Sequence, residues 1–366
     1  MAETTANLAR GRVRHGPSAC RSGAVPYFTG ARREAVYALL FEALALLRGA
    51  GLKVIVDIHP NSRHPVWGQD AVASGMHTEA FQAVAGVIES FGARLSPSDR
   101  SWVALELLNE PRLKCQGEQQ DLWQAMAGDL VRRARAASPL LTLVVSGACV
   151  SSIDGLLALD PSSFHDDNIV YTFHFYEPFS FTHQGAQFIP WPDKYLDGVP
   201  WPVSARPIGE PLALMNRLID GMSGLDAAAR ETARRGARHN LERLYTAGAG
   251  RETIEARFAQ LADWARRYGI RPSAVFNGEF GVMRRAQGKP GAFCGDRLAW
   301  LRDVRLASEK YGFPWAYFSY DGPLALVLDD DERLLDAGVL AALGLHSNCG
   351  SFCRPDCALP GHSRSK

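Results

Sequence analysis

Short apolar runs alternate with longer segments of helical spacing along most of the chain. The run 52–60 (LKVIVDIHP) is rich in β-branched residues, as a strand buried on both faces requires. Similar runs predict further strands at 102–111, 140–147, 168–178, 273–281 and 314–322. Helical spacing predicts helices at 31–47, 77–94, 119–137, 224–247, 251–268, 292–311 and 333–343. This alternation predicts a parallel sheet with helices packed outside it.

The predicted fold class is α/β, a TIM (β/α)8 barrel. Six strands are recognisable, and since a closed barrel has eight, the first two should precede residue 52. We expect three regions: an irregular N-terminal segment (1–27), a catalytic barrel (28–345) and a disordered tail (346–366). The segment 179–223, with many Pro, Gly and aromatic residues, is expected to be a long loop over the barrel mouth.

Composition narrows the range of partners. The chain has 366 residues, 46% of them hydrophobic, and a net charge of +1, which argues against nucleic-acid and membrane-surface binders. No apolar run reaches the roughly 18 residues needed to span a bilayer. The first 16 residues are polar and lack the apolar region of a secretory signal, so either the protein is cytoplasmic or its true start is missing. A monomer is expected.

The seven cysteines are spaced irregularly, so a fold built on disulfides is not expected. Cys115 and Cys149 both lie just past predicted strand ends, and a bridge between them is possible. Three more, Cys349, Cys353 and Cys357, lie near His346 and His362 in the tail. A metal site there is conceivable, but the segment otherwise has the composition of a polar tail, and no metal is expected.

Polar side chains gather where the predicted strands end, which is the face where barrel enzymes place their active sites. They are Asp57, His59, Asn109, Glu110, His174, Tyr176 and Glu279. Residues two apart on a strand point to one side, so Asp57 and His59 form one pair and His174 and Tyr176 another. A histidine such as His59 alone would be structural about as often as functional. The whole set, each member at a strand end, indicates a site.

Two carboxylates at the tips of separate strands suit glycoside cleavage. One protonates the leaving oxygen, the other attacks the anomeric carbon, and water then releases the glycosyl-enzyme. A separation of about 5–5.5 Å between the carboxyl groups would mean retention of configuration. A metal-dependent hydrolase with Asp57, His59 and His174 as ligands is the weaker alternative, because no tight His/Asp ligand motif is present.

Four segments, LELLNEP, NIVYTFHFYEPFSFTHQGA, FNGEFG and WAYFSYDG, resemble glycoside hydrolase family 5, the cellulase family. The resemblance implies that Glu110 is the acid/base and Glu279 the nucleophile. It implies that Asn109 holds the sugar 2-hydroxyl, that His174 and Tyr176 orient the carboxylates, and that His59 lines the subsite before the cleavage point.

The resemblance also implies a retaining endo-β-1,4-glucanase that needs no cofactor, acts on a polysaccharide or oligosaccharide, and works outside the cell or in the periplasm. A β-mannanase or β-1,3-glucanase, and a catalytically impaired, truncated carbohydrate-binding barrel, remain alternatives.

The chain departs from the family pattern in two places. The family usually has a Trp platform on its last strand, where this chain has Phe318, with Trp315 three residues earlier. Phe also stacks on a sugar, with less area. The family also has an Arg in a V-R-L-P-like stretch that braces the nucleophile. The nearest candidate is Arg14, in RVRHG. Codons for 17–22 read in another frame allow V-R-L-P-V, so a frame-shifted N-terminus is our hypothesis for the missing strands.

Overall fold

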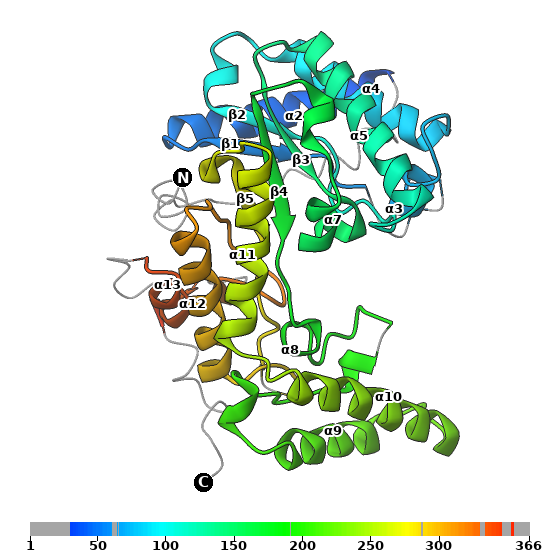
Figure 1. The fold of residues 1–366 in the computed structure, drawn as a ribbon, viewed down its shortest axis with the longest axis vertical. Helices are drawn as coiled ribbons and strands as arrows, with labels where there is room; N and C mark the ends of the chain where they lie inside the picture. Colours follow the sequence, from blue (N-terminus) through cyan, green and yellow to red (C-terminus); the bar gives the residue numbers. More distant parts are fainter. Residues whose placement is uncertain are drawn as a thin grey trace. The chain divides into compact units, whose positions relative to one another are not determined.

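A computed structural model describes residues 30–60, 64, 66–190, 192–286, 288–329, 334–345 and 353–354 (Figure 1). The chain divides into two compact units. The first comprises the residues up to His174 together with Gln260–Gly278, and the second comprises Phe175–Ala259 and the residues from Glu279 onward. The chain therefore passes from one unit to the other at the ends of two strands that carry candidate site residues.

Five strands form one sheet in the described part of the chain, in the order of the sequence (Figure 1). They are β1 (Val54–Asp57), β2 (Val103–Glu106), β3 (Thr142–Ser146), β4 (Ile169–His174) and β5 (Val275–Glu279). Neighbouring strands from β1 to β4 pair in parallel. Each strand falls inside a predicted strand, because an apolar run bounded by polar residues is typical of a buried parallel strand. In β1, however, only Val56 is buried and Ile55 is exposed, so in the described part of the chain this strand is not buried on both faces as we predicted.

The pairing of β1 with β2 continues beyond the strand ends. The backbone N–H of Ile58 donates to the carbonyl of Glu106 at 3.1 Å, and that of Asn109 donates to the carbonyl of Ile58 at 2.9 Å. These bonds hold the segment that follows β2 beside the segment that follows β1. As a result Asn109 lies next to His59.

The first unit buries its helices against the sheet and against one another. Its long helices are α2 (Gly30–Gly49), α4 (Glu79–Arg94) and α5 (Glu118–Ala137), and the last two pack side by side (Figure 1). Helix α4 begins where Thr78 Oγ1 accepts a hydrogen bond from the Phe81 N–H at 3.2 Å, a standard N-cap. The predictions for these three helices are confirmed to within a few residues.

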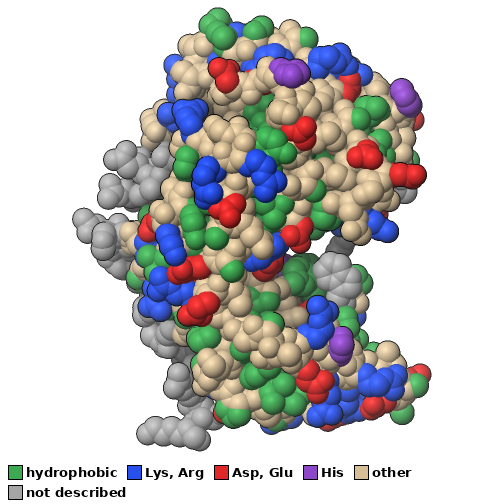
Figure 2. Space-filling model, in the orientation of Figure 1, with side chains coloured by type: hydrophobic (Ala, Val, Ile, Leu, Met, Phe, Trp, Pro, Cys, Tyr) green, Lys and Arg blue, Asp and Glu red, His purple; other side chains and the backbone are tan. Residues whose placement is uncertain are grey.

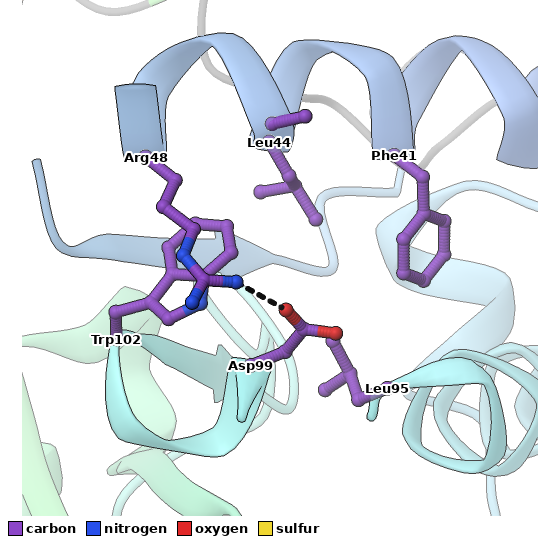
Figure 3. Close-up of a pocket in the computed structure, with 7 residues that line it drawn as sticks. Phe41, Leu44, Arg48, Leu95, Asp99 and Trp102 are labelled. Atoms are coloured by element: carbon purple, nitrogen blue, oxygen red, sulfur yellow. Dashed lines mark hydrogen bonds and ion pairs between the residues drawn. The ribbon is translucent and has the colours of Figure 1, made fainter. Parts of the chain in front are cut away.

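A small pocket of about 190 Å³ lies between α2 and the residue before β2 (Figure 3). The guanidinium of Arg48 covers the Trp102 ring at 5.4 Å and forms an ion pair with Asp99 at 3.4 Å. Trp102 precedes β2, whereas Glu110 follows it. The pocket is therefore at the opposite end of that strand from the candidate site.

The second unit has an aromatic core. Trp300, on α12 (Cys294–Lys310), stacks on Phe175 at 6.0 Å, and Phe258 meets Phe175 edge-on at 5.0 Å. The helices α10 (Ala227–Thr246), α12 and α13 (Ala337–Ala342) confirm their predictions, as does α11 (Arg251–Arg267), which runs from the second unit into the first. A small sheet joins β6 (Val327–Asp329), β7 (Leu334–Asp336) and β8 (Cys353–Arg354).

The segment 179–223 is not the long loop that we predicted. It contains the short helix α8 (Phe179–Thr182) and the helix α9 (Gly209–Gly221), which packs beside α10 (Figure 1). Met215 and Ile219 are buried on α9, and Leu212 completes an i, i+3, i+7 spacing that marks an apolar helix face. This spacing predicts a helix, but we gave more weight to the many Pro and aromatic residues of the segment and predicted a loop.

The segment 314–322 does not form the strand that we predicted: only Trp315 has a bridge pairing, and bends begin at Phe318. The N–H of Phe318 donates to the Phe280 carbonyl at 3.0 Å, as a neighbouring strand would. The carbonyl of Ser319, however, accepts from the N–H of Leu326 at 2.8 Å, so the chain turns back on itself. The backbone groups at this point therefore form hydrogen bonds within a local turn and not with a neighbouring strand.

Basic and acidic side chains are interspersed on the face shown in Figure 2, in keeping with the near balance of charge. No helix among the described residues is long and apolar enough to cross a bilayer. The predicted irregular N-terminus, Arg14, the frame-shift hypothesis, and the tail apart from β8 concern residues outside the described ranges.

Candidate active site

A chain of polar side chains follows β1 and β2 in the first unit. His59 Nδ1 lies 3.1 Å from Asp57 Oδ2, and His59 Nε2 lies 3.5 Å from Asn109 Nδ2. If Nδ1 carries the proton and donates it to the carboxylate, Nε2 is left to accept from the Asn109 amide. Asp57 thus orients His59, and His59 orients the amide of Asn109. The adjacency expected of Asp57 and His59 is present.

Glu110 has an uncommon backbone. Its φ is +45°, in the left-handed region that costs a residue with a Cβ about 1–2 kcal/mol. Its N–H donates to Ser151 Oγ at 3.2 Å. Its Oε1 lies 3.1 Å from Nδ1 of His174, whose side chain is 3% exposed against 30% for Glu110. The carboxyl group therefore has a fixed, buried neighbour while remaining open on one side.

Tyr176 and Glu279 meet in the second unit. The Tyr176 hydroxyl donates to Glu279 Oε2 at 2.9 Å. The N–H of Phe175 donates to the Glu279 carbonyl at 2.8 Å, and Thr182 Oγ1 donates to the Tyr176 carbonyl at 2.7 Å. A phenol that donates to a carboxylate stabilises its negative charge, as a nucleophile requires. Both partners are held by backbone contacts of their own.

Gly278 explains how β5 can bring Glu279 to this position. A Cβ placed on Gly278 would lie 2.5 Å from Thr172 Oγ1 and 3.5 Å from His174 Cδ2. Contacts under 3.0 Å do not occur for real Cβ atoms, and Thr172 is fully buried with little room to move. The glycine of the G-E-F-G motif is therefore a spacer that lets β5 lie close to β4.

The two aromatic candidates for a sugar platform differ in exposure. Trp315 is 5% exposed and packs edge-on against Phe280 at 5.8 Å, so its ring offers almost no surface to a ligand. Phe318 is half-buried. Of the two, Phe318 is the residue whose ring remains available, and Trp315 belongs to the core.

Several supporting residues were not singled out in the sequence. Ser151 and Thr182 contact the backbone of candidate residues and lie in no recognisable motif. Arg257 donates to both carboxylate oxygens of Glu177, the residue after Tyr176, at 2.8 and 2.9 Å. The possible bridge between Cys115 and Cys149 is formed. Ser146, which ends β3, donates through Oγ to the carbonyl of Leu108 at 3.1 Å.

Comparison with known proteins gives matches of three kinds. Residues 17–322 match the family described as "Cellulase (glycosyl hydrolase family 5)". Endoglucanase 3 of Fibrobacter succinogenes is 25% identical over 299 residues, which is 81% of this chain and 40% of that protein. The chain thus spans about two fifths of the length of this relative.

Solved structures are also similar. The clostridial cellulose synthase subunit Z from Clostridioides difficile has a TM-score of 0.59 at 22% identity, over 85% of this chain and 80% of that one. Thermotoga maritima Cel5A in complex with mannotriose has a TM-score of 0.59 at 16% identity, over 86% and 81%. At such identities the likeness shows the fold, and it confirms the TIM barrel class. Since the family match covers most of the residues, the chain belongs to the cellulase family, glycosyl hydrolase family 5.

Proposed function

We propose that this protein is a retaining endo-β-1,4-glucanase with Glu110 as acid/base and Glu279 as nucleophile. The observation that carries the proposal is that each carboxylate has a partner side chain of its own, Glu110 in the segment that follows β2 and Glu279 at the end of β5. His174 lies 3.1 Å from Glu110, and Tyr176 donates to Glu279 at 2.9 Å. Membership of a glycosyl hydrolase family supports the same assignment.

The proposed reaction has two steps. Glu279 attacks the anomeric carbon while Glu110 protonates the departing glycosidic oxygen, which leaves a glycosyl ester on Glu279. Glu110, now ionised, removes a proton from water as the water attacks the same carbon and frees Glu279. His174 holds the Glu110 carboxyl in both steps. The Asn109 amide, oriented by His59, binds the 2-hydroxyl of the sugar.

The substrate is proposed to be a β-1,4-linked glucan, because a relative that matches over 81% of this chain is named an endoglucanase. A β-1,4-mannan is the second candidate, because the similar Cel5A structure is a complex with mannotriose. Because the proposed platform is Phe318 and the Phe ring is smaller than a Trp ring, we expect weaker stacking on the sugar for either substrate.

Initial rates on carboxymethyl-cellulose, mannan and laminarin test the substrate class, with Glu279→Gln as the paired variant. We expect the highest rate on carboxymethyl-cellulose and a loss of at least about a thousandfold in Glu279→Gln. A folded but inert parent would favour the carbohydrate-binding alternative. A fully active Glu279→Gln would refute the nucleophile assignment.

Retention has its own test. A 2-deoxy-2-fluoro-β-cellobioside with a good leaving group should label the protein, and the label should map by mass spectrometry to the peptide that contains Glu279. Proton NMR of the first product formed should show the β-anomer. An α-anomer as first product would show inversion and would reject the two-step reaction.

We also propose that the protein works in an oxidising compartment, outside the cytoplasm. The Cys115–Cys149 disulfide supports this, as does the disulfide-bonded state of Cys294, because disulfides persist in secreted and periplasmic proteins. A polymeric glucan is also a substrate found outside the cell. Free-thiol titration of the protein taken from each cell fraction tests the proposal, and a fully reduced, active protein would contradict it.

A further inference from the structure

The turn that carries Ser151 is costly to form. Cys149, Val150 and Ser151 have φ values of 53°, 54° and 58°, three consecutive left-handed residues without a glycine. Each costs about 1–2 kcal/mol, and the cost is greatest for a β-branched residue such as Val150. Such a turn persists only where its surroundings hold it.

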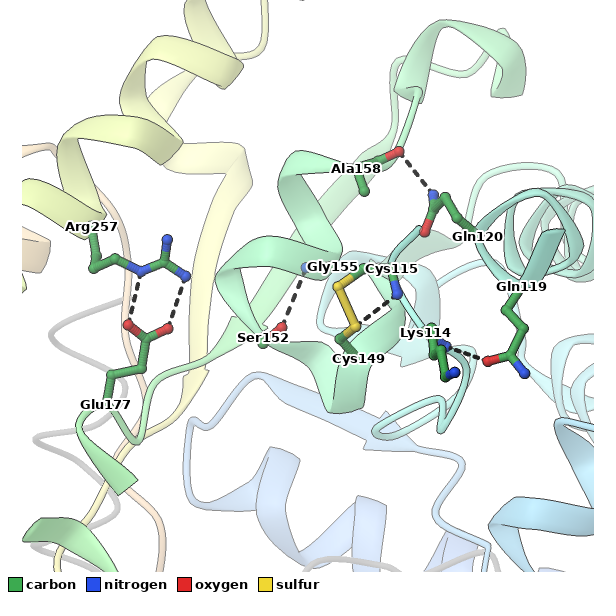
Figure 4. Close-up of a disulfide and its surroundings, with 10 residues drawn as sticks. All are labelled: Lys114, Cys115, Gln119, Gln120, Cys149, Ser152, Gly155, Ala158, Glu177 and Arg257. Carbon is green, nitrogen blue, oxygen red and sulfur yellow. Dashed lines mark hydrogen bonds and ion pairs between the residues drawn. A yellow bond between two sulfur atoms is a disulfide. The ribbon is translucent and has the colours of Figure 1, made fainter. Parts of the chain in front are cut away.

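The segment that follows Glu110 holds this turn in place. The N–H of Cys149 donates to the Leu113 carbonyl at 2.8 Å, and that of Val150 donates to the Pro111 carbonyl at 3.0 Å. The Cys115–Cys149 disulfide adds a covalent link between the two segments (Figure 4). Two hydrogen bonds and one disulfide therefore fix the turn against residues 111–115.

The turn places the Ser151 hydroxyl within hydrogen-bonding distance of the backbone N–H of Glu110. Ser151 is fully buried, and its Oγ accepts the Glu110 N–H at 3.2 Å. A turn that only joined two segments would need no hydroxyl at this position, and glycine would adopt the same φ at lower cost. Serine at this φ is explained by the acceptor that it supplies to a residue which is itself left-handed, at +45°.

Resting on the proposed function, we propose that Ser151 is a positioning residue for the general acid. By fixing the backbone N–H of Glu110, it holds the Glu110 side chain in the direction from which a proton reaches the leaving oxygen. Its effect should therefore depend on how much the leaving group needs protonation. A cellooligosaccharide needs it in the first step, and 2,4-dinitrophenyl β-cellobioside does not, because its leaving phenolate is already stable.

The test compares kcat/KM on cellotetraose and on 2,4-dinitrophenyl β-cellobioside for the full chain and for Ser151→Gly. Glycine removes the hydroxyl but also relieves the left-handed backbone, so the gain at the backbone offsets the stability lost with the hydrogen bond and we expect the variant to fold. We expect kcat/KM on cellotetraose to fall about tenfold, as loss of one hydrogen bond allows, and to change less than about twofold on the activated substrate. Equal losses on both substrates, or none on either, would overturn the proposal.

Ser152→Ala is the matched control. Ser152 is the adjacent residue, but its Oγ accepts from the Gly155 N–H at 3.3 Å and caps α7 (Ile153–Leu157) (Figure 4). It should lower the melting temperature without changing the ratio of the two kcat/KM values. If it shifts that ratio as Ser151→Gly does, the effect belongs to the loop in general and the positioning role is rejected.

Glu110→Gln separates this inference from the proposed function. It should abolish cleavage of cellotetraose while keeping much of kcat/KM on the activated substrate. If Glu110→Gln cleaves cellotetraose at the parent rate, the acid assignment fails, and the role of Ser151 fails with it. If Glu110→Gln behaves as expected but Ser151→Gly matches the parent, only the role of Ser151 is wrong.

Discussion

The double substitution Cys115→Ser and Cys149→Ser removes the disulfide and should lower the free energy of unfolding. The length of the loop that the disulfide closes sets an upper limit on this loss. The bridge spans a sequence separation of 34 residues. Closing a loop of that length lowers the entropy of the unfolded chain enough to stabilise the folded state by about 4 kcal/mol at 25 °C. This value is an upper bound, because the left-handed turn at Cys149 can relax once the link is gone, which returns about 1–2 kcal/mol.

We therefore expect a loss of about 2–4 kcal/mol in the free energy of unfolding. Guanidinium unfolding under non-reducing conditions measures it, with intrinsic tryptophan fluorescence as the reporter, to which the buried Trp123 and Trp264 of the first unit contribute. Val150→Gly is the control, because it eases the same turn and leaves the bridge intact. It should be neutral to stabilising by about 1 kcal/mol. A double variant as stable as the parent would show that the bridge does not constrain the fold.

Three further predictions concern other residues. Tyr176→Phe removes a hydrogen bond to a charged group, worth about 1.5–3 kcal/mol, so kcat/KM should fall about tenfold to a hundredfold, and an unchanged value would refute the role of the hydroxyl. Phe318→Ala should raise KM for cellotetraose about threefold to tenfold, because it removes the proposed stacking platform. If KM rises in Trp315→Phe and not in Phe318→Ala, Trp315 is the platform and the assignment of Phe318 is wrong. Burial raises the pKa of the Asp99 carboxyl, but hydrogen bonds from Ser96 and the charge of Arg48 outweigh burial and lower it from the ordinary value of 3.8. The ionised carboxylate therefore stabilises the fold above pH 3.8, and this stabilisation is lost as the pH falls through the pKa of the folded state. Asp99→Asn should thus be less stable than the parent at pH 7 and converge with it in acid, and a difference that persists at pH 2 would contradict this.

The sheet could be predicted from the sequence because strands buried on both faces are nearly all apolar. VALE in β2 is almost wholly buried, and the polar residues just after it mark the strand end. VIVD in β1 was recognised by the same apolar composition, although only Val56 of that strand is buried among the described residues. The same logic identified Asn109 and Glu110 as site candidates. It failed at 314–322, which is also largely apolar and aromatic but turns back through the hydrogen bond from the Leu326 N–H to the Ser319 carbonyl.

The support around the candidate site could not be predicted, because its cause is tertiary. Nothing local favours three left-handed residues at Cys-Val-Ser, and intrinsic preference opposes them. The contacts to Pro111 and Leu113, more than 30 positions earlier, impose the conformation. The bridge between Cys115 and Cys149 could be named only as a possibility, because sequence alone does not fix which cysteines meet.

Because Glu110 has a left-handed backbone, selection for thermal stability and selection for catalytic rate favour different residues at this position. At φ +45° a glycine or asparagine is the residue that the backbone prefers, so a screen that rewards only heat tolerance should replace the glutamate. The same holds for Ser151 at +58°. Engineering of this enzyme for heat tolerance should therefore keep both positions fixed, since the substitutions that most improve folding there would remove the proposed acid and the hydroxyl that accepts its backbone N–H.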